Sequence, residues 1–375
     1  MVIAVNVNSS IPAYKEGYEN FIHECFTRII NKQPQHTFIF FNAQNFSKEF
    51  PDATNVRLIM QSITKPKSLI SWILLSRRLQ RLLRNYKPDI IVSADGLCSF
   101  KSRCRQYIIH QDALPEARFK LIKKGQQIIY NFFASRCLKR AKRIGVLSES
   151  IKANVVRLHK IAADKIDTLY CGLNECFIPA TFEEKDVIKN EIASGSEYFL
   201  IVSAIHREKD LVCILKAFSG FKKRQKSSMH LVIINSNAIA HNNFTELLQT
   251  YKYRHEVKLT GTVSELKSVQ ITAAAYAIIH LSQLEVYSMP IIEAMRCQVP
   301  VITGNLPDMH ELAGDAAMYF IPDDYLDLSQ KMQLIFKDEQ LRQAFINKGK
   351  VQSELYSWDK TAGSLWEGLN KSTTF

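Results

Sequence analysis

The feature that most constrains this chain is a repeated alternation of short apolar stretches with amphipathic helical stretches. In the first half, Val2–Val7, Thr37–Phe41 and Asp89–Val92 have the apolar composition of buried strands, and helical patterns separate them. This alternation predicts βαβ units, whose strands pair in parallel because each connection crosses over the sheet. We therefore expect an α/β fold, with ligand loops at the carboxyl ends of the strands.

Further elements of the first half follow from the same periodicities. Helices are predicted at about 18–31, 67–85 and 119–142, and strands at Gln106–Ile109 and Arg143–Leu147. Ser148 or Ser150 is expected to cap the next helix. The stretch 172–196 is polar and mixed, and it is interpreted as the linker and the entry to the second domain.

The alternation starts again after the predicted linker. Strands are predicted at Tyr198–Val202, His230–Ile234, Val257–Leu259, Ala277–His280 and Val299–Ile302, with a helix at Leu211–Arg224. A chain of 375 residues is also too long for one ordinary core. We predict two Rossmann-like, doubly wound α/β domains, residues 1–180 and 181–375. The final helix, after Trp358, is expected to cross back toward the first domain.

Positive charge is concentrated in the first half. Residues 1–180 hold 28 Lys+Arg against 13 Asp+Glu, a charge of +15, whereas residues 181–375 hold 21 against 23, a charge of −2. Arginines 77, 78, 81 and 84 fall on one face of the helix predicted at 67–85. Two interpretations stay open: a solvated face of a core helix, or contact with an anionic membrane surface or lipid-phosphate acceptor. Nucleic acid is not expected, because no recognised RNA or DNA motif accompanies the charge.

Targeting and metal signals are weak in this sequence. No stretch reaches the roughly 18 to 20 uncharged apolar residues that a membrane helix needs. The N-terminus opens into Val2–Val5 without a secretory leader, so a cytoplasmic location is expected, with the inner face of the membrane as a peripheral site. The eight cysteines show no Cys-x-x-Cys pair and no repeated ligand spacing, which favours reduced thiols and no metal site.

The stretch 285–293 has the physical features of an anion site. Pro290 suits the first turn of a helix that follows the strand ending near His280. Free amide groups between Ser288 and Ile291, together with the positive end of the helix dipole, favour a nucleotide diphosphate. Glu285 precedes the helix and Glu293 lies one turn inside it, and carboxylates accept hydrogen bonds from vicinal sugar hydroxyls.

This stretch, Glu285-Val-Tyr-Ser-Met-Pro-Ile-Ile-Glu293, resembles the signature of family 4 retaining glycosyltransferases, with seven residues between two glutamates. The likeness extends to Ile205–Leu211 and Ser357–Ala362. It implies the GT-B arrangement, two Rossmann-like domains facing across a cleft. It also implies transfer of a hexosyl unit, with retention, from a nucleotide-sugar donor to a hydroxyl of a glycan or lipid-linked acceptor, without a cofactor or metal.

The resemblance implies a role for each matching residue. Glu293 would hold the ribose hydroxyls and Glu285 the transferred sugar. Lys209 would bind the diphosphate, as the family's lysine after a strand and turn does, and Arg207 would reach the same phosphates. Ser288 and Met289 would bind the donor at the helix start.

Two implied site residues belong to the first half. Gly17 corresponds to the family's glycine-containing loop, which leaves room near the donor phosphates. His110 resembles the family's histidine at the cleft edge, where it would bond the donor sugar or share a proton.

The sequence departs from the family pattern at five positions. Glu19, Val286, Ser288 and Gln298 replace usual glycines, and Ala204 replaces an arginine. These departures leave a second function open: a non-catalytic glycosyltransferase-like protein that binds a sugar nucleotide or a partner. A dinucleotide-dependent oxidoreductase is not expected, because no Gly-x-Gly-x-x-Gly turn follows an early strand.

Overall fold

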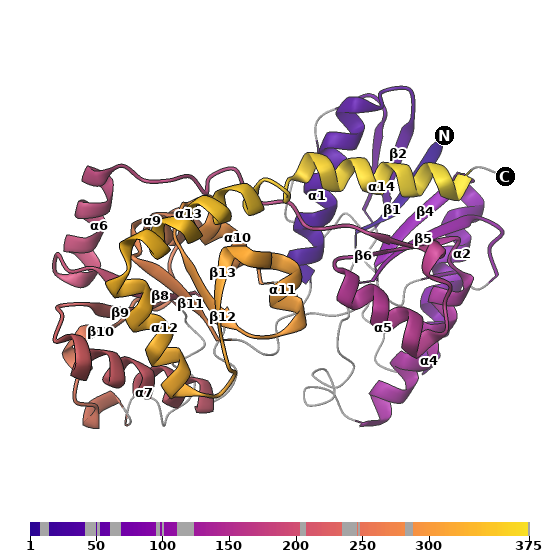
Figure 1. The fold of residues 1–375 in the computed structure, drawn as a ribbon. Helices are drawn as coiled ribbons and strands as arrows, with labels where there is room; N and C mark the ends of the chain where they lie inside the picture. The colour runs from indigo at the N-terminus through magenta and orange to yellow at the C-terminus, as the bar shows by residue number, and fades with distance from the viewer. Residues whose placement is uncertain are drawn as a thin grey trace. The chain divides into compact units, whose positions relative to one another are not determined.

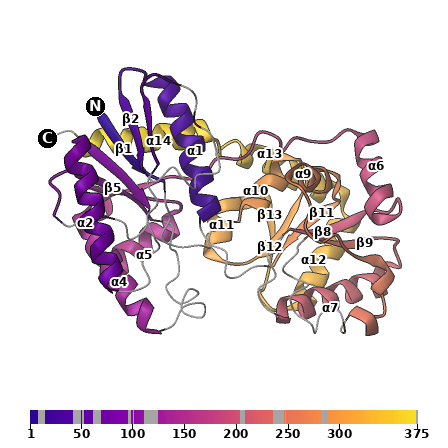
Figure 2. The ribbon, with the colours of Figure 1, turned by 180° about the vertical axis from the view of Figure 1, so that it is seen from behind.

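The computed structural model of the chain comprises two compact units (Figures 1 and 2). Unit 1 is Met1–Gly172 together with Ser357–Phe375, and unit 2 is Leu173–Tyr356. The structure describes residues 1–7, 15–41, 50, 53–60, 69–94, 98–99, 101–110, 124–202, 208–234, 246, 248–281 and 288–373. Within these ranges, no helix is long and apolar enough to cross a membrane.

Unit 1 is built on a seven-stranded parallel sheet with the order β3-β2-β1-β4-β5-β6-β7. The central strand β1 places Val5 between Phe40 of β2 and Val92 of β4. The strands are β1 (Val2–Asn6), β2 (Thr37–Phe41), β3 (Val56–Ile59), β4 (Ile90–Ala94), β5 (Arg105–His110), β6 (Arg143–Val146) and β7 (Ile166–Thr168). The strand order reverses direction beside β1, the position where doubly wound sheets bind ligands.

Helices cover both faces of this sheet, as alternation along β2 shows. Phe38 and Phe40 contact Phe26 of α1, whereas Ile39 and Phe41 belong to a cluster with the leucines of α2. Successive strand residues point to opposite faces, so α1 and α2 lie on opposite sides. The helices of unit 1 are α1 (Lys15–Lys32), α2 (Leu69–Tyr86), α4 (Lys124–Arg140), α5 (Glu149–His159) and α14 (Trp358–Thr373), with a 3-10 turn η3 at Ala163–Lys165.

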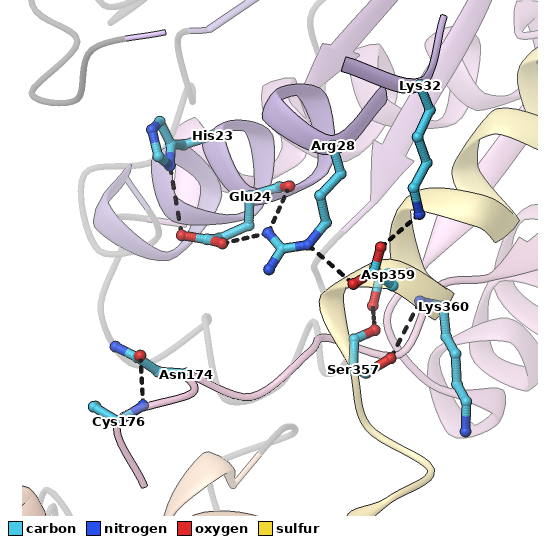
Figure 3. Close-up of polar contacts among 10 residues, drawn as sticks. His23, Glu24, Arg28, Lys32, Asn174, Cys176, Ser357, Asp359 and Lys360 are labelled. Atoms are coloured by element: carbon cyan, nitrogen blue, oxygen red, sulfur yellow. Dashed lines mark hydrogen bonds and ion pairs between the residues drawn. The ribbon is translucent and has the colours of Figure 1, made fainter. Parts of the chain in front are cut away.

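The last helix, α14, is fixed against α1 (Figure 1). Asp359 pairs with Lys32 at 2.6 Å and with the Arg28 Nε at 3.6 Å, as Figure 3 shows. Trp358 packs edge-on against Phe21, and Trp366 lies against His36. These cations hold the pKa of Asp359 below its usual range, mainly through the hydrogen bond from Lys32.

Unit 2 repeats the arrangement with a six-stranded sheet, all of whose strand pairs are parallel. Its order, β10-β9-β8-β11-β12-β13, is the Rossmann order 3-2-1-4-5-6 when the strands are counted from β8. The strands are β8 (Tyr198–Val202), β9 (His230–Ile234), β10 (Val257–Leu259), β11 (Ala277–His280), β12 (Val301–Gly304) and β13 (Ala317–Phe320).

The second sheet is also covered on both faces. Phe199 of β8 packs on Phe221 of α7, while the neighbouring Tyr198 donates a hydrogen bond to the Ile271 carbonyl of α9. Figure 1 accordingly shows α7 and α12 on one side of the sheet and α9, α10 and α13 on the other. The helices are α6 (Phe182–Ala193), α7 (Glu208–Gln225), α9 (Glu265–Ala274), α10 (Met289–Arg296), α11 (Pro307–Ala313), α12 (Tyr325–Lys337) and α13 (Glu339–Ser353).

The predicted α/β, doubly wound fold is confirmed, and so is the Ser148 cap, whose side chain accepts the Ile151 amide. The linker interpretation of 172–196 is wrong in part, because α6 lies inside it. A capping box starts that helix: Thr181 and Glu184 bond each other's backbone amides. Strands β3, β7 and β13 were not predicted; Arg57 interrupts the apolar run of β3, and Asp167 interrupts that of β7.

Two glycines of α14 give a test of how tightly this helix packs. A Cβ at Gly368 would stand 2.7 Å from the Asp167 carboxylate and 2.8 Å from the Tyr107 ring, whereas a Cβ at Gly363 meets nothing within 4 Å. We expect Gly368→Ala to lower the free energy of unfolding by about 1–3 kcal/mol through overpacking. Gly363→Ala should raise it by up to about 1 kcal/mol through helix propensity. Denaturant unfolding measures both, and equal effects at the two sites would contradict the packing shown.

Candidate active site

The start of α10 lies at the carboxyl edge of the unit 2 sheet. Strand β11 ends at His280, Ser288 occupies the position before the helix, and Pro290 lies in the first turn. Ser288 is fully buried and its carbonyl accepts the Ile291 amide at 3.1 Å, while Met289 is partly exposed. The first amides of a helix have no carbonyl partner within it, so this end of α10 suits an anion. Glu285 lies outside the described residues.

Glu293 lies on α10, one turn after Met289, and is partly buried. Burial, with a smaller contribution from the negative charge of Glu265, raises the pKa of Glu293 from 4.5 to about 7. A carboxyl with this pKa exchanges its proton near neutrality. Perturbed carboxyls of this kind are enriched at functional sites.

A polar cluster surrounds Glu293. Asn174 donates to Glu265 Oε1 at 2.6 Å, and the Asn174 side-chain oxygen accepts the Cys176 amide at 3.2 Å, a bond drawn in Figure 3. Burial raises the pKa of the Cys297 thiol to about 12, and Glu293 adds to this effect. The sequence analysis missed this cluster. Asn174 and Cys176 fell in the stretch interpreted as a linker, and Glu265 carried only the signal of a helix start.

Lys209 lies in the first turn of α7, which follows β8. Its Nζ is 2.8 Å from the Asp323 carboxylate, and both side chains are about half exposed. Exposed pairs of this type contribute at most about 1 kcal/mol. The ammonium can therefore exchange Asp323 for a phosphate at little cost. Arg207 lies outside the described residues.

The topology brings α7 and α10 to the same edge of the sheet. Strands β8 and β11 are parallel neighbours, with Ala277 opposite Phe199. Lys209 follows the first strand and Ser288 the second, so both residues stand beyond the carboxyl ends of adjacent strands. Ser288, Met289, Glu293 and Lys209 thus belong to one edge of unit 2.

The predicted residues of unit 1 also lie at a carboxyl edge. His110 is the last residue of β5, is buried, and its ring centroid is 6.2 Å from that of His159 in an edge-on arrangement. Gly17 lies in the first turn of α1, not in a loop, because the helix begins at Lys15 and not at the expected residue 18. It is exposed and has open space where a Cβ would be.

A bound metal ion needs a group of ligand side chains close together. Across the residues that the structure describes, no group of three or more His, Cys, Asp or Glu side chains is arranged to hold a metal ion. Each of the eight cysteines is a free thiol.

Comparison with known families matches both halves of the chain. Residues 182–352 match the model of glycosyl transferases group 1, and residues 16–175 match that of glycosyltransferase family 4. The chain belongs to the group 1 glycosyltransferases. The resemblance drawn from residues 285–293 is thereby confirmed at the level of the family.

Curated relatives of this group 1 glycosyltransferase include two O-antigen enzymes. It is 23% identical over 223 residues to O-antigen chain mannosyltransferase B of Escherichia coli, a match that covers 59% of this chain and 58% of the relative. It is 25% identical over 199 residues to O-antigen chain mannosyltransferase RfbU of Salmonella typhimurium, a match that covers 53% of this chain and 52% of the relative. The matched region spans little more than half the length of these relatives.

Solved structures with the same fold cover nearly the whole chain. A glycosyltransferase from Rickettsia africae has a TM-score of 0.73 at 18% identity, over 98% of this chain and 97% of its own. WaaG, a glycosyltransferase involved in lipopolysaccharide biosynthesis, has a TM-score of 0.68 at 14% identity, over 96% and 98%. Alr3699/HepE of Anabaena, solved with UDP and glucose, has a TM-score of 0.70 at 13% identity, over 98% and 99%. These likenesses confirm the GT-B fold class.

The raised pKa of Glu293 predicts a stability effect with a defined sign. Because the pKa in the folded state, about 7, exceeds the ordinary value of 4.5, folding loses stability as pH rises through this window. Glu293→Gln keeps the neutral form. We expect it to match the wild type at pH 4, below the ordinary pKa, and to exceed its free energy of unfolding by on the order of 3 kcal/mol at pH 8. Denaturant unfolding at both pH values checks this, and a variant no more stable at pH 8 would contradict it.

Proposed function

We propose that this protein is a glycosyltransferase that moves a hexosyl unit from a nucleotide sugar to a hydroxyl of a glycan or lipid-linked acceptor in polysaccharide biosynthesis. The observation that carries the proposal is the common edge of unit 2, because the start of α10, Glu293 and Lys209 all follow the carboxyl ends of two adjacent parallel strands. The mannosyltransferase relatives make mannose the first sugar to test.

In this proposal, different residues of unit 2 bind different parts of the donor. The amides at Ser288 and Met289 and the Lys209 ammonium bind the diphosphate, with Arg207 as a further cation. They stabilise the charge that develops on the leaving nucleoside diphosphate, so no metal or cofactor is required. Glu293 accepts hydrogen bonds from the ribose hydroxyls, and Glu285 binds the transferred sugar.

The reaction breaks the bond between the anomeric carbon and the phosphate oxygen and forms a bond from that carbon to the acceptor oxygen. The departing nucleoside diphosphate keeps the electron pair of the broken bond and takes up the proton of the acceptor hydroxyl. His110 contacts the donor sugar in this proposal, and Gly17 leaves room for the phosphates. We propose retention at the anomeric carbon from the family signature at 285–293, and we name no residue as a covalent nucleophile.

The donor assignment is tested first by Glu293→Ala. We expect the affinity for the nucleotide sugar to fall by roughly 1.5 to 3 kcal/mol, the range of hydrogen bonds to charged groups. Wild-type affinity should also rise between pH 6 and pH 8, since the ionised form of Glu293 is the better acceptor. Calorimetry measures both. The matched control is Glu339→Ala, which removes a glutamate from the first turn of α13. Equal affinities in the wild type and Glu293→Ala would refute the ribose assignment.

Activity itself is tested by nucleoside-diphosphate release from a panel of uridine and guanosine diphosphate sugars. We expect Glu285→Gln to reduce turnover more than nucleoside-diphosphate affinity, because its partner is the sugar. A wild-type protein that binds a donor without turning it over, with or without acceptors, would establish the alternative of a non-catalytic sugar-nucleotide-binding protein.

We also propose peripheral contact of unit 1 with an anionic membrane surface. In α2, Leu79, Leu82 and Leu83 are buried, whereas the arginines at 77, 78, 81 and 84 are exposed. Leu74 on the same helix is 56% exposed, which adds an apolar side chain to the basic face. A basic helical face with exposed apolar residues suits an anionic lipid surface.

Vesicle sedimentation tests this contact. Binding to anionic vesicles should fall steeply as salt rises to physiological strength, because the attraction is screened. The variant Arg78→Gln/Arg81→Gln should bind more weakly than the wild type. The control Lys223→Gln/Arg224→Gln removes the same charge from α7 of unit 2 and should bind like the wild type. Equal binding by all three proteins would leave the α2 face as an ordinary solvated surface.

A further inference from the structure

A cavity of about 440 Å³ opens at the amino end of β5 in unit 1. It is lined by Arg103, Cys104, Arg105, Gln106, Arg140, Ala141, Lys142 and Lys165. Strand β5 begins at Arg105 and ends at His110, so its two ends are separated by roughly 17 Å at the rise of a strand. The cavity therefore lies at the edge of the sheet opposite the one that carries His110.

The lining of this cavity is strongly cationic. Five of its eight residues are Arg or Lys, and none is acidic. An acid that lies nearby is Asp89, whose charge acts on the Cys104 thiol and whose carboxylate accepts the Val2 amide at 2.7 Å. Among the residues that the structure describes, neither Arg103 nor Lys142 forms an ion pair.

Backbone contacts hold two of the cations in place. Arg140 Nε donates to the Ser99 carbonyl at 3.0 Å, and its NH2 group donates to the Ser102 carbonyl. Lys165 Nζ donates to the carbonyls of Lys139 at 2.8 Å and Leu138 at 3.3 Å, at the end of α4. The cavity wall is thus formed in advance by the fold and does not depend on freely rotating side chains.

A structural role accounts for only part of this arrangement. Arg140 and Lys165 complement the negative end of the α4 dipole. Among the residues that the structure describes, no salt bridge accounts for Arg103 or Lys142, and like charges at this spacing repel one another. Burial and the charge of Lys142 lower the pKa of Lys165, so these two lining lysines act on each other. A bound anion with several charges would relieve this repulsion.

We propose that this cavity binds a phosphate or pyrophosphate group, carried either by a soluble ligand or by a lipid headgroup, at a site separate from the donor site. An arginine guanidinium group can donate two parallel hydrogen bonds to a phosphate, and a lysine ammonium adds a compact positive charge. The volume lies within the usual range of small-molecule sites, roughly 300–1,000 Å³. The proposal does not depend on the reaction proposed above.

Hydrogen exchange with the full-length protein tests the site. Inorganic pyrophosphate should slow amide exchange in the peptides that cover 101–106 and 139–143. In Arg103→Gln/Lys142→Gln this protection should need at least about tenfold more pyrophosphate, the loss expected for removed charge-assisted bonds. The matched control Lys139→Gln removes one exposed cation of α4 that does not line the cavity, and it should behave like the wild type. Protection that is absent, or equal in all three proteins, would overturn the proposal.

A second arm distinguishes the source of the phosphate. The same peptides are followed with vesicles of phosphatidylcholine containing phosphatidic acid and with vesicles of phosphatidylcholine alone. Protection by the phosphatidic acid vesicles that is lost in Arg103→Gln/Lys142→Gln assigns the site to a lipid headgroup. Protection by pyrophosphate alone assigns it to a soluble ligand. Protection by plain phosphatidylcholine to the same extent, with none by pyrophosphate, would contradict a phosphate site.

Discussion

Parallel strand pairing is the constraint on which the rest of this structure depends. A parallel sheet needs a crossover connection after every strand and a cover on both faces, so each strand is followed by a segment that returns over the sheet. In both units the strand order also reverses beside the first strand, at β1/β4 and at β8/β11. The carboxyl ends of neighbouring strands therefore present their following residues side by side. Lys209 and Ser288 become neighbouring parts of one edge for this reason, although 79 positions separate them in the sequence.

That edge combines a carboxyl group whose pKa lies near neutrality with a cation in an exposed ion pair. Glu293 is partly buried near a second carboxylate, Glu265, so its charged form is disfavoured and its pKa stands near 7. Lys209 is exposed and is paired with Asp323. Neither arrangement contributes much to the stability of the fold. They suit a site that exchanges its partners, because a sugar hydroxyl can satisfy the carboxylate and a phosphate can displace the aspartate.

In unit 1 the excess positive charge is organised by the fold. The arginines of α2 lie on the exposed face because the leucines of the same helix pack on β1, β2 and β4. A second group of cations surrounds the cavity at the amino end of β5, where the end of α4 and the turn η3 converge. By contrast, the cations Arg28 and Lys32 are paired with Asp359 and help to fix α14. The three groups of basic residues thus lie on an exposed helix face, around a cavity, and in ion pairs with Asp359.

The sequence by itself determined the α/β class, the two doubly wound sheets, ten of the thirteen strands that the structure describes, and the family. These features rest on local information: apolar periodicity along each element, and the spacing of Glu285, Pro290 and Glu293. The helix at Phe182–Ala193 was also signalled locally, by Thr181 and Glu184, although the polar stretch around it obscured the signal. The strand Ile166–Thr168 was missed because Asp167 interrupts its apolar run, and its pairing with β6 places it in the sheet.

Only the tertiary structure decided which side chains surround the candidate site residues. Asn174 and Glu265 meet near Glu293 although they are 91 positions apart, and Asp323 reaches Lys209 across 114 positions. The raised pKa of Glu293 and the clustering of Arg103, Lys142 and Lys165 likewise exist only in the folded chain. The physical reason is that desolvation and charge interaction depend on distance in space, whereas the sequence reports directly only on contacts within a few residues along the chain.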